Sequence, residues 1–190
     1  MVLLILNPLP IKALSELLGY GIPYICSTIC SLHYLLIPDN PESPICTFHK
    51  SFPDFLTDPR QCKDNQFFIE PAVQHVEILL SCLNLMRVKL KKNICHLGDQ
   101  DVLSEVKDLS AQKKDYIGDT LEYACKFWTK YLLEIPSTDS HVKKVQEAID
   151  TFFTICLPYW IEILALIGNL GVGVHAINNI EKWYDLVSAA

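Results

Sequence analysis

The strongest constraint on the fold is a stripe of apolar residues that repeats every three or four positions after Pro71. This spacing places the whole stripe on one face of an α-helix. Its members are Val76, Leu79, Leu80, Leu83, Met86 and Leu90. Pro71 suits the first helical position, and the far end is rich in lysine and arginine, which the helix dipole favours there. We therefore expect a long amphipathic helix that starts at Pro71.

The same periodicity predicts further helices on both sides of this one. They are expected at residues 11–18, 23–32, 115–133, 160–167 and 177–187, with another from about residue 140 to a kink or restart at Pro158. Half of the residues are hydrophobic and a fifth are charged. This balance is enough to bury a core and lies far from the composition of disordered chains.

Turn-forming residues fill positions 38–44, between two short apolar runs at 34–37 and 45–48. This arrangement predicts a small β-hairpin near residues 34–48. Because the hairpin follows two helices, we expect a winged-helix module at residues 1–56. Met1 falls inside the first helix of such a module, so the module is expected to be truncated at its N-terminus.

The predicted fold class is mainly α, a truncated winged helix with a small β-hairpin followed by a helical bundle. Residues 57–70 are polar and irregular and are interpreted as a linker. Residues 71–190 are expected to form a separate helical linker domain.

Two long stretches are almost free of charge, residues 17–38 and 151–180. Each is long enough to span a membrane, but glycine, proline and polar residues interrupt both, so we interpret them as buried core. Residues 1–6 lack the charged start of a signal peptide. The eight cysteines are scattered without a CxxC pair, which is typical of reduced thiols in a cytoplasmic protein.

Metal and nucleic-acid binding remain the alternative hypothesis, that of a zinc- or nucleic-acid-binding winged-helix regulator. A zinc site can be drawn from Cys26, Cys30, His33, Cys46 and His49. The spacing matches no common zinc finger, so we expect core packing instead and assign no metal ligand. Residues 23–32, the recognition helix of a winged helix, contain no basic residue, and the net charge is −6. Both features argue against binding to phosphates.

Catalytic motifs are missing from the sequence. It has no GxxxxGK[ST] loop, no GxSxG and no HExxH, so we predict no enzymatic activity, no catalytic residue and no bound cofactor.

Several segments, in order, resemble one family. The stretches LSELLG, LHYLLIP and HKSFPDFLTDPRQC look like the region just after the nucleotide-binding module of basidiomycete NACHT/WD-repeat proteins, which are STAND-class signalling ATPases. The later SEVKDL, LEYACKFWTKYL and YWIEILALIGNL resemble the helical linker before the propeller of the same proteins. The resemblance covers nearly the whole chain, although the P-loop, the Walker B acid and the WD repeats of the family are missing.

The resemblance implies a role for His49. In that class the winged helix ends in a methionine-histidine-aspartate-like signature, whose histidine contacts the β-phosphate of ADP. His49 occupies the matching position, with Phe48 in place of the methionine, Lys50 in place of the aspartate, and Asp54 at a second acidic position. The implied function is that of a regulatory, protein-interaction fragment that couples nucleotide state to a sensor domain.

Two protein partners are expected, a NACHT nucleotide-binding module and a second copy of the chain. The charge-free residues 23–32 should leave an apolar patch uncovered when that module is missing. We therefore expect self-association or binding of a hydrophobic dye, and better solubility after removal of residues 1–60. No membrane or nucleic-acid partner is expected.

Overall fold

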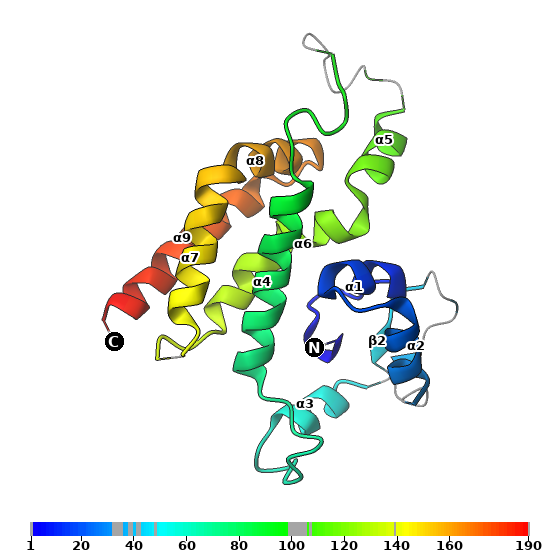
Figure 1. The fold of residues 1–190 in the computed structure, drawn as a ribbon, viewed down its shortest axis with the longest axis vertical. Coiled ribbons are helices and arrows are strands. Elements are labelled where there is room, and N and C mark those ends of the chain that lie inside the picture. The colour runs from blue at the N-terminus through cyan, green and yellow to red at the C-terminus, as the bar shows by residue number, and fades with distance from the viewer. Residues whose placement is uncertain are drawn as a thin grey trace.

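The computed structural model describes residues 2–31, 36–37, 40, 43–47, 49–98, 106, 108–138 and 140–189. Helices make up most of these residues (Figure 1), which confirms that the chain is mainly α. The elements are η1 Val2–Leu4, α1 Ile11–Leu18, α2 Ile22–Ser31, β1 Leu36–Ile37, β2 Cys46–Thr47, α3 Ser51–Thr57, α4 Pro71–Lys89, α5 Leu109–Tyr116, α6 Gly118–Leu133, α7 Val142–Ile155, α8 Leu157–Leu166 and α9 Leu170–Ser188.

Helices α4 and α6 form the centre of the molecule (Figure 1). The stripe predicted on α4 is largely buried, with Leu79 and Met86 fully enclosed. Helix α6 presents Leu121, Trp128 and Leu132, which are also fully enclosed. Helices α7, α8 and α9 cover one side of this pair, and α1 packs against both helices on another.

Aromatic side chains lock the outer helices onto α6. The rings of Trp128 and Phe152 lie 4.8 Å apart, and Trp160 of α8 meets the Phe152 ring edge to face at 5.5 Å. The Trp160 indole N–H donates to the Cys125 carbonyl at 2.9 Å, and that of Trp183 in α9 donates to the Ile135 carbonyl at 3.3 Å. The indoles of Trp160 and Trp183 thus bury their apolar bodies while their N–H groups are satisfied, which fixes the orientation of α8 and α9.

The winged helix predicted for residues 1–56 is wrong. In the described part of the chain the strands β1 and β2 have two residues each and pair antiparallel. The pairs are Leu36 with Thr47 and Ile37 with Cys46. The amide of Ile45 donates instead to the Leu9 carbonyl at 3.0 Å, and Pro44 forms an isolated bridge with Pro10. Because proline has no N–H to extend a ladder, the described residues of this region form only this short pairing and not the wing of a winged helix. Of the β-hairpin predicted near residues 34–48, residues 34, 35, 38, 39, 41, 42 and 48 lie outside the described part of the chain.

Several helix boundaries confirm the sequence prediction, and others do not. Helix α1 lies between Pro10 and the left-handed Gly19 (φ +72°), and α4 begins at Pro71, as predicted. Helices α3 and α5 were not predicted, and the helix expected at 115–133 is divided where Gly118 adopts φ +63°. The restart near Pro158 is confirmed, because α8 begins at Leu157. The proposed boundary at residues 57–70 stays a prediction, and α1 contacts α4 and α6 across it.

None of the described helices alone combines the length and hydropathy that a membrane span needs, while the bent pair α7 and α8 meets both criteria together with 73° between its halves.

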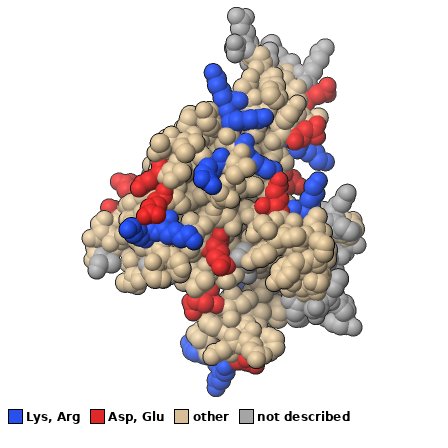
Figure 2. Space-filling view, in the orientation of Figure 1, with Lys and Arg blue, Asp and Glu red and all other residues tan. Residues whose placement is uncertain are grey.

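Charged residues lie over the surface (Figure 2). Lysine and arginine gather over the upper end of α4 and the lower half of α7 on the face shown, while acidic residues are interspersed among them. The net charge of −6 therefore does not make this face uniformly acidic.

Gly173 generates a prediction about helix packing. A Cβ atom at this position of α9 would lie 3.2 Å from Leu164 Cδ1 and 3.7 Å from the Trp160 ring, whereas one at Gly171 would meet nothing within 4 Å. We expect Gly173→Val to lower the free energy of unfolding by about 1 to 3 kcal/mol, because it overfills a packed contact. The matched Gly171→Val should change it by less than about 0.5 kcal/mol. Urea titrations compare the two, and equal losses would show that this contact does not require glycine.

Candidate functional site

His49 is an exposed residue directly before α3. Its Nδ1 accepts a hydrogen bond from the Ser51 amide at 3.1 Å and lies 2.8 Å from Ser51 Oγ. Since an amide can only donate, Nδ1 carries no proton in this arrangement and Nε2 is the donor of the neutral ring. His49 therefore satisfies the start of α3 with one nitrogen and leaves the other to donate to a partner.

Lys50 and Asp54 line a hollow of about 690 Å³ that His49 does not line. The remaining wall comes from the N-terminal strap, which we define as residues 2–6, and from the start of α4 and the end of α6. The structure thus brings two of the four signature positions together, while Phe48 lies outside the described residues. It also adds charged groups that the sequence did not point to, Lys130 and Glu134.

His75 of α4 lies in the wall of this hollow. Burial lowers the pKa of His75, while the charge and backbone of Glu134 act in the opposite direction. Its Nδ1 is buried without a hydrogen-bond partner among the described residues, and its ring lies 5.9 Å from that of Tyr131. The imidazole of His75 is half-buried, and desolvation disfavours its charged form, so its pKa is lowered.

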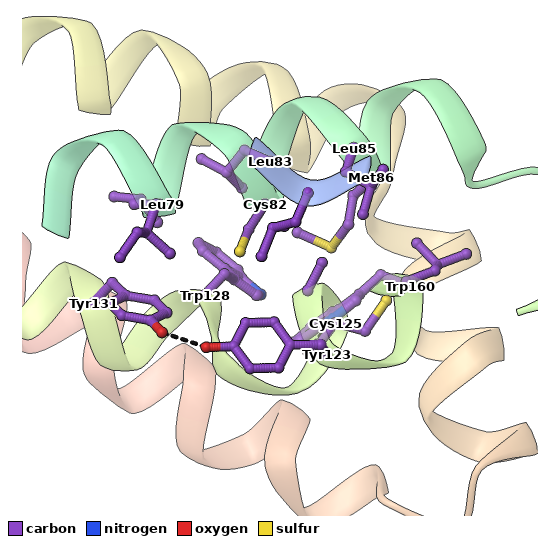
Figure 3. Close-up of a cluster of buried hydrophobic side chains, with 14 of the residues drawn as sticks. Leu79, Cys82, Leu83, Leu85, Met86, Tyr123, Cys125, Trp128, Tyr131 and Trp160 are labelled. Carbon is purple, nitrogen blue, oxygen red and sulfur yellow. Dashed lines mark hydrogen bonds between the residues drawn. The ribbon is translucent and has the colours of Figure 1, made fainter. Parts of the chain in front are cut away.

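Two buried tyrosines of α6 hold the strap in place. Figure 3 shows the hydroxyl groups of Tyr123 and Tyr131 hydrogen-bonded to each other. The Leu6 amide donates to both hydroxyls, at 3.1 and 3.0 Å, and the Tyr131 hydroxyl donates to the Leu4 carbonyl at 3.3 Å. The backbone of the strap thus provides hydrogen-bond partners for the two tyrosine hydroxyls, which α6 would otherwise bury with fewer partners.

Burial also determines the ionisation of this pair. It raises the pKa of Tyr131 to about 12 and raises that of Tyr123 further, where the neighbouring Tyr131 adds to the effect. Both side chains are therefore neutral at physiological pH, so they act as a structural contact and not as acid or base catalysts.

The zinc hypothesis finds no site in the described structure. No group of three possible ligands occurs among the described histidine, cysteine and acidic residues. Cys46 is exposed on β2 and Cys26 is half-buried on α2. His33 and the side chain of Cys30 lie outside the described residues.

The buried cysteines are chemically protected. Cys82 and Cys125 are fully enclosed in the α4–α6 contact, and burial raises the pKa of both thiols far above its usual range. The thiolate is the reactive form. These two positions are consequently unsuited to nucleophilic catalysis.

A comparison with curated proteins finds a distant relative. The chain is 27% identical over 155 residues to the vegetative incompatibility protein HET-E-1 of Podospora anserina. The alignment covers 74% of this chain but 11% of the relative, so the chain spans about a ninth of that protein. HET-E-1 is a fungal NACHT/WD-repeat protein, and the similarity weakly supports the resemblance drawn from the sequence motifs.

No family model matches the chain, and no solved structure matches it.

Sequence reasoning missed the groups that surround Lys50 and Asp54. Tyr123 and Tyr131 are eight positions apart on the buried face of α6, which is indistinguishable from ordinary core spacing. His75 had no neighbouring motif. Only the long-range packing of the strap against α6 makes these residues noticeable.

The tyrosine pair predicts a loss of stability in alkali. The pKa of Tyr131 is higher in the folded chain (about 12) than its ordinary value of 10.0. The folded state therefore keeps a proton that the unfolded state loses between these values. Stability should be fully present below about pH 10 and fall as the pH rises toward about 12.

Urea titrations at several pH values check this expectation. At neutral pH, Tyr131→Phe should cost about 1 to 2 kcal/mol, because the Leu4 carbonyl loses its donor. The variant should also show a shallower decline in alkali. Tyr24→Phe, at a tyrosine of α2 that is 62% exposed, is the control and should leave the decline unchanged. An identical decline in Tyr131→Phe and the parent chain would contradict the assignment.

Proposed function

We propose that this chain is a non-catalytic regulatory segment of a NACHT-type signalling protein, which contacts a nucleotide-binding module and passes its nucleotide state to a sensor. The observation that carries the proposal is the similarity to HET-E-1 over 74% of the chain. The helical architecture and the exposed position of His49 support it.

The N-terminal part offers a surface for such a contact. Tyr20, Ile22 and Tyr24, at the start of α2, are exposed by 45, 45 and 62%. Large apolar side chains grouped on a surface are common where proteins meet. We propose that this group and His49, both in the N-terminal part of the chain, contact the same partner module.

His49 is proposed to donate from Nε2 to a phosphate of ADP held by the partner module. The ring is exposed, and Ser51 already occupies Nδ1, which fixes the orientation of the imidazole. A hydrogen bond to a charged phosphate contributes about 1.5 to 3 kcal/mol, more than a neutral one. This contact would favour the ADP-bound state of the module.

The test measures the release of labelled ADP from a purified NACHT module with and without this chain. We expect the parent chain to slow release, and His49→Ala to remove about 1.5 to 3 kcal/mol of that effect. His49→Asp keeps an acceptor for the Ser51 amide but repels phosphate, so it should be equally impaired with α3 intact. His175→Ala, an exposed histidine of α9, is the control.

Two outcomes would contradict the proposal. Equal ADP release with the parent chain and with no chain would remove the coupling role. If both His49→Ala and His49→Asp slow ADP release as much as the parent chain does, His49 does not contact the nucleotide. Its role is then limited to the hydrogen bond at the start of α3.

A further inference from the structure

Helices α4 and α7 form a groove on the surface of the bundle. We define the α4–α7 groove by its floor, Leu83, Phe152 and Cys156, and its rim, Arg87 and Lys144; it encloses about 340 Å³. The floor residues are buried, whereas both rim residues are exposed. An apolar floor between two charged rims is the geometry that receives an amphipathic helix.

The groove is continuous because each helix contributes one straight face. Leu80, Leu83, Asn84 and Arg87 lie three or four positions apart on α4, and Lys144, Glu147, Ala148 and Thr151 repeat this spacing on α7. Residues so spaced share a helix face. The two helices are in contact and run in the same direction in Figure 1, so the two faces form parallel walls.

Charge determines which partner fits. Within the described residues, neither Arg87 nor Lys144 takes part in an ion pair. Asn84 Oδ1 accepts from the Arg87 guanidinium at 3.0 Å and holds it at the rim. Burial raises the pKa of Cys156 in the floor, and the charge of Arg87 opposes that rise, as expected for a guanidinium beside the groove.

Lysines extend this positive character beyond the groove. Lys91 and Lys92 follow the end of α4 and Lys143 adjoins Lys144, whereas Glu147 is the single acid that lines the groove. Figure 2 shows basic side chains gathered over both of these regions. A chain with a net charge of −6 thus presents a locally positive rim around an apolar floor.

We propose that the α4–α7 groove binds an acidic amphipathic helix of a partner protein. The apolar face of that helix lies on the half-buried Leu80 and Ala148, above the floor, and two carboxylates meet Lys144 and Arg87. This groove is a second interaction surface within the proposed protein-interaction function, and it does not include His49.

The probe is a fluorescent synthetic helix with leucines on one face and a glutamate on each side of that face, measured by anisotropy with the full chain. We expect saturable binding that the double variant Arg87→Glu and Lys144→Glu weakens about tenfold or more. A probe with lysines in place of the glutamates should show the reverse preference and bind the double variant better. Ala148→Phe, which fills the groove without changing its charge, should also weaken binding.

Controls separate the groove from other surfaces. Lys182→Glu changes an exposed lysine of α9 and should leave the affinity unchanged, as should His49→Ala. Circular dichroism should show parent helix content in every variant, since both rim side chains are exposed. The ADP experiment can fail while this one succeeds, and the reverse, so the two proposals are distinguishable.

Several results would overturn the proposal. These are no binding of the acidic probe to the parent chain, equal loss with Lys182→Glu, or loss with His49→Ala. Binding of phosphatidylserine vesicles or duplex DNA that needs Arg87 and Lys144, without binding of the probe, would assign the groove to another anionic partner and reject this one.

Discussion

The contact between α4 and α6 is the interaction on which the rest of the structure depends. Leu79, Cys82 and Met86 of α4 face Trp128 and Cys125 of α6, and all five are fully buried (Figure 3). Helices α1, α5, α7, α8 and α9 each contact one or both of these two helices. The strap, the hollow and the α4–α7 groove each use residues of α4 or α6. Because a packed interior tolerates few voids, a change that separated these two helices would disturb all three features together.

Local signals in the sequence predicted the strong helices well, because caps and stripes act over a few residues. Pro10 and Gly19 gave the ends of α1, and Pro71 gave the start of α4. Helix α3 was missed because it is short and has no buried residue, and α9 was predicted to start late because Gly171 and Gly173 look like helix breakers. The winged helix failed for a different reason, since the pairing of the segment at Ile45 with the segment before α1 is a long-range choice that local pattern does not contain.

The candidate site was only partly accessible from sequence for the same reason. Family resemblance pointed to His49, Lys50 and Asp54, and the similarity to HET-E-1 agrees with that resemblance at low identity and partial coverage. It could not place Lys50 and Asp54 beside His75 and Glu134, because these four residues meet only through tertiary packing. The α4–α7 groove follows from two helix faces that were each predictable, but their alignment was not.

The strap has a consequence for how the chain is made. Its hydrogen bond from the Leu6 amide to Tyr131 joins residues 125 positions apart, so the segment that leaves the ribosome early must wait for a helix that is synthesised much later. At about 5 to 20 residues per second the wait lasts roughly 6 to 25 seconds. Throughout that time Val2, Leu3, Leu4 and Ile5 cannot contact α6, which makes this nascent segment a natural client for chaperones that bind exposed apolar segments.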